Sequence, residues 1–191
     1  YLIKSRLILI LATAIGIIWL GWTSSELFHE DLTPILLLSG AISFGTVLYL
    51  IGILHNGFLN MRVFGNTYIL FSSIISIAAL YLLSFADIHE DLEGGLVINA
   101  LGVIPLIIST VIFATLTFFN MRLARSDTSV YTSGKLELIS LITIHLLSYV
   151  VLLHPNISEY LYFILLNFVI IGASAVFILL GVSDRRSIMV N

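Results

Sequence analysis

Histidines that stand beside acidic residues are the side chains best suited to chemistry in this sequence. The segment His29-Glu30-Asp31-Leu32 recurs as His89-Glu90-Asp91-Leu92. Imidazole nitrogens and carboxylate oxygens bind divalent metal ions. If the fold brings the two segments together, they could share one ion, with the later His154 as a third imidazole. The candidate metal ligands are therefore His29, Glu30, His89, Glu90, Asp91 and His154.

The same motif has an interpretation that needs no metal. Acidic residues just before a helix complement the positive end of its dipole, and Thr33-Pro34 is typical of an N-cap followed by proline at the first helical position. Helix capping and membrane topology account for the motif without a ligand, and we favour this interpretation. The sequence requires no metal and no other cofactor.

His145 is the one histidine deep within a long apolar stretch. A haem held by two histidines would need a second imidazole at the same depth, and the sequence offers no obvious one. A single buried histidine more often forms a hydrogen bond with a neighbouring group. We therefore predict an interhelical hydrogen bond at His145, which is also the one candidate for cofactor binding.

Other charged side chains are expected outside the apolar stretches. Transporters and proton pumps keep ionisable residues at membrane depth, because these residues bind the ion or carry the proton. We expect no Asp, Glu, Lys or Arg at that depth. Uncharged polar residues remain, and small side chains four residues apart let helices approach closely. The predicted packing residues are Asn99, Asn167, Gly172, Ser39 and Ser43.

A membrane-embedded fold must position these residues. Of the 191 residues, 59% are hydrophobic and 10% are charged, whereas an average soluble chain is about 25% charged. Six long segments lack charge, and each is near the roughly 20 residues with which a helix crosses a bilayer. We predict one all-α transmembrane domain over residues 1–191, with helices at 7–24, 34–55, 67–86, 95–119, 137–154 and 160–182. Because the chain has no cysteine, disulfides and thiolate metal sites are excluded.

The distribution of charge predicts how these helices are oriented. All Lys and Arg residues fall on one side of the six predicted helices, and most of the acidic residues fall on the other side. By the positive-inside rule, both termini are cytoplasmic and the acidic loops face outward. On this prediction Glu137 lies on the cytoplasmic side, at the very start of its helix.

Two motifs recur with a period of 60 residues. The histidine motif of residues 29–32 returns at 89–92, and Asn60-Met61-Arg62 returns as Asn120-Met121-Arg122. Each unit contains two helices and returns to the same side, so the repeats are parallel. We predict three helical hairpins, in repeat units over approximately 4–63 and 64–124 and a degenerate third over 134–187.

Signatures of nucleotide-binding proteins, zinc proteases, kinases and hydrolases are absent, and so are the basic patches of nucleic-acid-binding proteins. Short loops and a nearly uncharged interior favour a non-catalytic accessory subunit that packs against other membrane subunits or further copies of itself. The alternative is a small transporter or channel built from hairpin repeats. A third interpretation is the metal- or haem-binding subunit of a membrane enzyme.

Overall fold

In the computed structural model, every described element is a helix. The structure describes residues 8, 10–16, 34–59, 61–85, 100–124, 131–153 and 159–183. The long helices are α2 (Pro34–Gly57), α3 (Arg62–Leu83), α5 (Ala100–Ala124), α6 (Tyr131–Leu153) and α7 (Glu159–Ser183), and residues 10–16 are also helical. The prediction of an all-α chain is confirmed for these residues.

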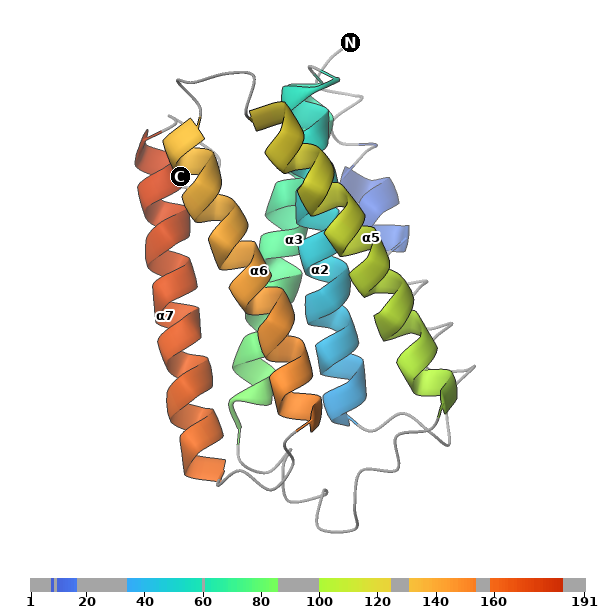
Figure 1. Cartoon of the computed structure of the whole chain (residues 1–191), viewed down its shortest axis with the longest axis vertical. Coiled ribbons are helices and arrows are strands. Elements are labelled where there is room, and N and C mark those ends of the chain that lie inside the picture. The colour runs from blue at the N-terminus through green and yellow to red at the C-terminus, as the bar shows by residue number, and fades with distance from the viewer. Residues whose placement is uncertain are drawn as a thin grey trace.

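The long helices lie side by side along one direction (Figure 1). α2, α5 and α7 run one way, and α3 and α6 run the other way. α2 is the centre of the bundle because it contacts α3, α5 and α6, whereas α7 packs mainly on α6 and α3. Side chains at the contact between α2 and α6 can therefore also contact the other helices that pack on α2.

The helix boundaries differ from the predicted ones at several charged residues. α2 begins at Pro34 as predicted, but α3 begins at Arg62, five residues before its predicted start at 67. Arg122 lies in the last turn of α5, which was predicted to end at 119. α6 begins at Tyr131 instead of 137. Charged side chains in the first and last turns of a helix can reach past the helix end. The charged residues that limit the uncharged segments therefore do not mark the ends of the helices.

Two of the described helices are long and apolar enough to cross a membrane, namely Leu36–Gly57 in α2 and Arg62–Leu83 in α3. The described apolar runs of the other helices are shorter, at Leu106–Arg122, Glu137–Val150 and Phe163–Val176. The structure therefore shows a helical chain with two helices that could span a bilayer.

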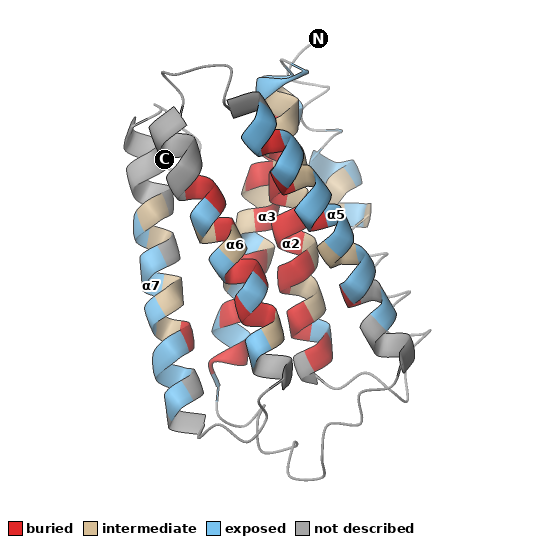
Figure 2. Cartoon of the chain, viewed as in Figure 1, coloured by how far each residue is buried: buried red, intermediate tan, exposed pale blue. Residues whose placement is uncertain are grey.

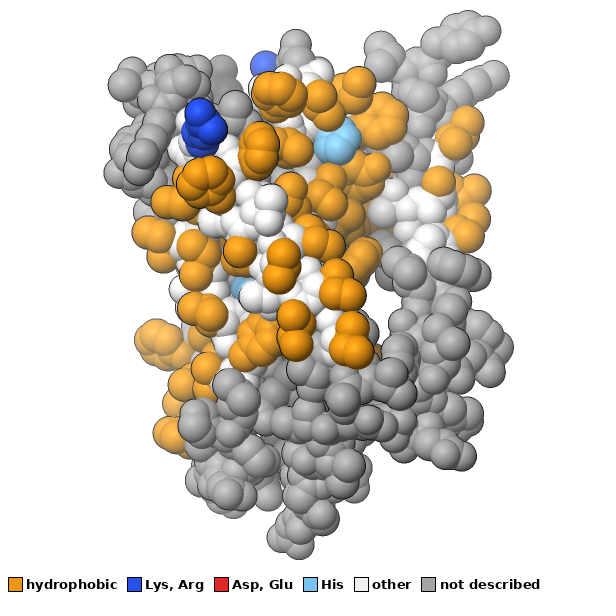
Figure 3. Space-filling view, turned by 45° about the vertical axis from the view of Figure 1, so that its right-hand side comes forward, with side chains coloured by type: hydrophobic (Ala, Val, Ile, Leu, Met, Phe, Trp, Pro, Cys, Tyr) orange, Lys and Arg blue, Asp and Glu red, His pale blue; other side chains and the backbone are white. Residues whose placement is uncertain are grey.

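The exposed faces of the helices are apolar, and many polar side chains are buried. Phe168 and Ile171 on α7 are 78% and 69% exposed, and Phe118 on α5 is 65% exposed. Figure 2 shows exposed residues along the outer sides of α5 and α7, and Figure 3 shows hydrophobic side chains over much of the described surface. The buried polar side chains are Ser39, Ser43, Thr46, Thr67, Ser72, Ser76, Ser84, Thr117, Asn120, Glu137, His145 and Ser148.

Glycines let α2 and α3 approach closely. A Cβ atom added at Gly52 would lie 2.8 Å from the carbonyl oxygen of Gly65 and 2.7 Å from Cγ1 of Ile69. A Cβ atom added at Gly65 would lie 2.6 Å from the carbonyl oxygen of Gly52. Small residues at a helix contact allow this backbone approach, so the α2–α3 pair has little room for larger side chains here.

Candidate functional site

A layer of polar side chains crosses the middle of the bundle between two apolar clusters. One cluster contains Leu36, Ile42, Leu80, Leu106 and Ile144, and the other contains Val47, Leu50, Ile69, Phe113 and Leu141, with further members in each. The polar side chains between them come from four helices. They are Ser43 and Thr46 of α2, Ser72 and Ser76 of α3, Ser109 and Thr110 of α5, and His145 and Ser148 of α6. We call these residues the polar layer.

His145 is the centre of the polar layer and is 2% exposed. Its Nδ1 atom lies 2.8 Å from the hydroxyl oxygen of Thr46, and its Nε2 atom lies 3.4 Å from the hydroxyl oxygen of Thr110. The imidazole ring also stacks on the ring of Phe113, with centroids 3.9 Å apart and planes at 3°. One side chain of α6 thus contacts both α2 and α5.

The hydroxyl groups beside His145 are also bonded to backbone carbonyl oxygens. The hydroxyl of Thr46 donates to the carbonyl oxygen of Ser43 at 2.8 Å, so its oxygen is left to accept a hydrogen bond from Nδ1. The hydroxyls of Thr110 and Tyr149 contact each other and donate to the carbonyl oxygen of Leu106, each at 2.8 Å. His145 thus belongs to a network of hydroxyl groups that joins α2, α5 and α6.

Glu137 lies inside α6 and is buried, with 4% of its surface exposed. The hydroxyl of Tyr49 on α2 donates to its Oε1 atom at 2.7 Å. The prediction that Glu137 lies at the very start of its helix is therefore wrong. The helix begins six residues earlier than predicted, at Tyr131, which moves Glu137 from the helix start to its second turn, where the Tyr49 hydroxyl stabilises the carboxyl group.

Helix periodicity places these side chains on one face of α6. Residues 137, 141, 145 and 148 recur every three or four positions, and all four are buried. On α2, Thr46 and Tyr49 are three residues apart and therefore also share a face. The sequence analysis did not select Thr46, Tyr49, Thr110, Glu137 or Tyr149. The spacing of Glu137, His145 and Tyr149 by eight and four residues was the signal that could have found them.

The predicted packing residues lie in different surroundings. Ser43 forms a hydrogen bond with Ser109 across the α2–α5 contact. Ser39 is fully buried, and its hydroxyl oxygen has no hydrogen-bond partner. Asn167 donates to the carbonyl oxygen of Phe163 in its own helix at 2.8 Å. Gly172 is exposed on α7, and Asn99 lies outside the described residues.

The six candidate metal ligands, His29, Glu30, His89, Glu90, Asp91 and His154, all lie outside the described residues. Within the described part of the chain, no group of three His, Asp or Glu side chains could hold a metal ion. His145 already contacts a hydroxyl group at each ring nitrogen, which leaves neither nitrogen directed at a vacant position. The structure therefore brings no metal or haem ligands together among the residues it describes.

The two copies of the Asn-Met-Arg motif have different local structures. Met61 and Arg62 lie at the junction of α2 and α3, whereas Asn120, Met121 and Arg122 lie within α5. Asn120 is buried, and its amide nitrogen donates to the carbonyl oxygens of Leu116 at 3.0 Å and Leu50 at 3.4 Å. The second copy thus connects α5 to α2.

Comparisons of the chain with protein-family models, curated proteins and solved structures found no match.

Proposed function

We propose that this chain is an integral membrane protein whose six helices cross the bilayer as three hairpins. The support is the distribution of polarity, with hydrophobic side chains on the exposed faces and hydroxyl, amide and carboxyl groups in the interior. In water this arrangement would expose a large apolar area, whereas lipid or another membrane protein can cover it. Arg62 and Arg122 lie at the same end of the bundle, as the positive-inside rule expects of the cytoplasmic end.

Within the membrane, the chain serves as a non-catalytic accessory subunit that packs against another membrane protein. The observation that supports this role is the outer face of α7, which consists of Leu161, Ile164, Phe168, Ile171, Gly172 and Ala175. Each of these residues is exposed. Positions 161, 164, 168, 172 and 175 are three or four residues apart, and Ile171 lies beside Gly172. A Cβ atom added at Gly172 would have no neighbour within 4 Å.

A small residue on a transmembrane helix usually marks a place where a second helix approaches closely. Gly172 and Ala175 leave such a place vacant on α7, and Ile171 and Phe168 beside it offer large side chains for packing. Lipid chains, by contrast, can cover a helix face that has no small residues. The outer face of α7 therefore fits a helix of a partner subunit.

Purification from native membranes tests this role. We expect the wild-type chain to copurify with a stoichiometric membrane partner, and Gly172→Leu to release that partner while the chain itself remains folded. The matched control is Ala114→Leu, which enlarges an exposed small residue on α5 and should keep the partner bound. If Gly172→Leu retains the partner, or if no partner copurifies with the wild-type chain, the accessory role is wrong.

The polar layer favours a second candidate function, that of a small transporter or channel. Transporter sites lie near the middle of the bilayer at helix contacts, and the polar layer lies between the two apolar clusters. Reconstitution of the purified chain alone into liposomes separates the candidates, because a transporter should carry solute without a partner. Thr110→Val, which removes a hydroxyl from the polar layer, should then reduce the flux.

A further inference from the structure

Ser39 on α2 carries a hydroxyl group that no described residue bonds. The side chain is fully buried, and its oxygen atom has no hydrogen-bond partner. A buried hydroxyl without a partner costs free energy, and buried water molecules in proteins typically bond such groups. Neither proposed function uses this residue. The Ser39 hydroxyl therefore points to a ligand that forms hydrogen bonds inside the bundle.

The contacts between α2 and α5 have the same register at two levels. Ser43 of α2 bonds to Ser109 of α5, which is 66 positions later in the sequence. The amide nitrogen of Asn120 donates to the carbonyl oxygens of both Leu50 on α2 and Leu116 on α5, a pair with the same offset. The two helices run in the same direction (Figure 1). A residue of α2 therefore lies at the level of the α5 residue with this offset.

In this register, Ser39 lies at the level of Pro105. Proline has no backbone N–H, so within a helix it cannot donate to the carbonyl oxygen four residues earlier. That oxygen belongs to Leu101, in the first turn of α5. In membrane helices, the carbonyl group that proline leaves free is bonded by hydroxyl side chains of neighbouring helices or by ordered water. Ser39 makes no direct bond, which favours ordered water.

The neighbouring carbonyl group of α5 is already bonded. The carbonyl oxygen of Leu106 accepts hydrogen bonds from Thr110 and Tyr149, each at 2.8 Å, and lies 3.3 Å from the hydroxyl oxygen of Ser109. It therefore offers no acceptor to Ser39. Figure 1 shows α2 and α5 diverging toward their first residues. A contact bridged by a small molecule fits this divergence better than a direct one.

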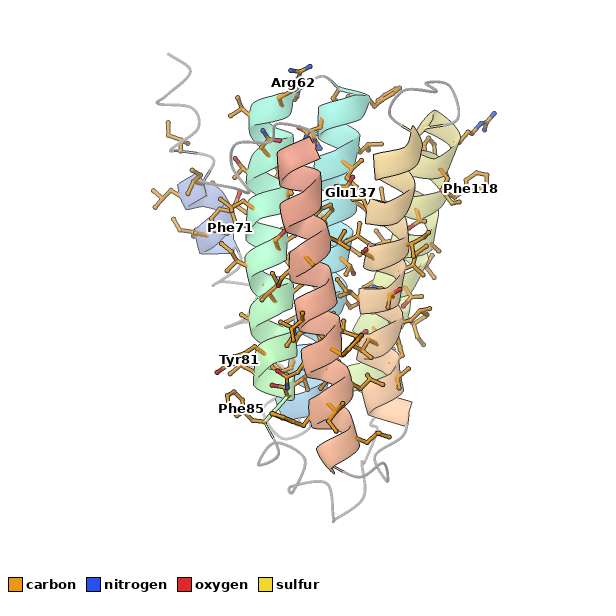
Figure 4. All side chains as sticks on the ribbon, turned by 90° about the vertical axis from the view of Figure 1, so that its left-hand side faces the viewer. Arg62, Phe71, Tyr81, Phe85, Phe118 and Glu137 are labelled. Atoms are coloured by element: carbon orange, nitrogen blue, oxygen red, sulfur yellow. The ribbon has the colours of Figure 1, made fainter. Side chains whose placement is uncertain are left out.

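A water molecule fits this position better than a cation. A cation at membrane depth is costly unless a charged partner stabilises it. Glu137 is the one acidic residue whose side chain is described, and Figure 4 shows it in the half of the bundle nearer to Arg62, away from Tyr81 and Phe85. The first turns of α2 and α5 lie at the opposite end from Arg62. Water needs only hydrogen-bond donors and acceptors.

We infer that an ordered water molecule bridges the hydroxyl of Ser39 on α2 to the carbonyl oxygen of Leu101 on α5, at the turn that Pro105 interrupts. The water molecule donates to the Leu101 carbonyl oxygen and accepts the hydrogen of the Ser39 hydroxyl. This inference rests on the proposed membrane location, because in water the solvent itself could bond the Leu101 carbonyl group. The first turns of α5 are thus joined to α2 through water.

Solid-state NMR of the full ¹³C-labelled chain in lipid bilayers tests this inference by polarisation transfer from water protons. Transfer to the Ser39 Cβ and to the Leu101 carbonyl carbon should be faster than transfer to the Ser72 Cβ. Ser72 is the matched control, because it is also fully buried but its hydroxyl donates to the carbonyl oxygen of Ile69 at 2.8 Å. Transfer to Ser39 as slow as that to Ser72 overturns the bound water.

Two variants test the bridge from its two ends. Pro105→Ala restores a backbone donor for Leu101, so it should slow transfer to the Ser39 Cβ. Ser39→Ala removes the other partner, so it should slow transfer to the Leu101 carbonyl carbon. Ser72→Ala is the control variant and should change neither transfer. If Ser39→Ala leaves the transfer to Leu101 unchanged, or Pro105→Ala leaves the transfer to Ser39 unchanged, the bridge is wrong.

A double-mutant cycle gives a readout that does not depend on the spectra. Ser39→Ala should lower the free energy of unfolding more in the wild type than in the Pro105→Ala background, because Pro105→Ala already removes one partner of the water molecule. The difference in helix propensity between serine and alanine is the same in both backgrounds and cancels. Equal effects in the two backgrounds overturn the bridge.

The exposed Phe168 of α7 separates a failure of this inference from a failure of the proposed membrane location. In a bilayer, transfer from water to the Phe168 ring should be slow. Slow transfer to both Phe168 and Ser39 overturns the bound water and agrees with the membrane location. Fast transfer to Phe168 overturns the membrane location, and this inference with it.

Discussion

His145 joins three helices through its two ring nitrogens and its stacked face. Thr46 of α2 and Thr110 of α5 lie at the nitrogens, and Phe113 of α5 covers the ring. A buried imidazole without these partners would lose hydrogen bonds that its apolar surroundings cannot replace. The side chain therefore specifies how α2, α5 and α6 align at the middle of the bundle.

His145→Gln should retain assembly with a modest loss of stability, of order 1 kcal/mol, because glutamine can still bond one hydroxyl group. Thr46→Val, which removes the hydroxyl group that contacts His145, should lower the free energy of unfolding by a similar amount. The double variant should lose less than the sum of the single losses, because both substitutions remove the same hydrogen bond. Unfolding in mixed micelles measures the three losses, and strict additivity would show that the two side chains do not interact.

A second prediction at this scale concerns the histidine motifs outside the described residues. If these motifs cap helices and set topology, His29→Ala with His89→Ala should change neither the metal content nor the assembly of the chain. If the histidines share an ion, binding must weaken as the imidazoles protonate below about pH 6.5. Metal analysis of the purified wild type and double variant measures this, and one bound ion lost in the variant would contradict our expectation.

At the scale of helices, the contact between α2 and α3 depends on glycine. Gly52 and Gly65 face each other closely enough for a Cβ atom on either residue to overlap the opposite backbone. Gly40 also lies on α2, but a Cβ atom there would have no neighbour within 4 Å. The close contact with α3 thus requires glycine at position 52 of α2, but it does not require glycine at position 40.

Gly52→Ala should destabilise the bundle by about 1–3 kcal/mol, because backbone atoms of α3 must move to admit the methyl group. Gly40→Ala is the matched control and should be neutral or stabilising by up to about 1 kcal/mol, since alanine has the higher helix propensity. Thermal unfolding in detergent or lipid gives both values. Equal effects of the two substitutions would mean that the contact is not as close as described.

Much of the fold could be predicted from the sequence, because long uncharged segments identify helices without knowledge of their partners. The prediction failed where a charged residue belongs to a helix. Glu137 was predicted to start α6, yet it lies in the second turn, where Tyr49, which is 88 positions away in the sequence, donates a hydrogen bond to its carboxyl group. Such a partner depends on tertiary packing. His145 was found because it interrupts an apolar stretch, but the identity of its partners Thr46 and Thr110 also required the structure.

At the scale of the whole molecule, charge and polarity are arranged along different directions. Across the bundle, the exposed faces are apolar and the described polar side chains are mostly buried among apolar clusters, whereas the described arginines gather at one end (Figure 3). The proposed bilayer location would account for both arrangements, because a bilayer core excludes polar groups and its cytoplasmic face retains positive charge. If the proposed location is right, the two ends of α3 face opposite sides of the membrane.

Single cysteines at these two ends test the orientation, and the native chain contains no cysteine that would add background. Met61, just before α3, is 49% exposed, and Phe85, just after it, is 43% exposed. Phe85→Cys should react with an impermeant maleimide on intact cells, and Met61→Cys should react only after permeabilisation, because it shares its end with Arg62. The opposite pattern would reverse the orientation. Labelling of both cysteines in intact cells would mean that α3 does not cross the bilayer.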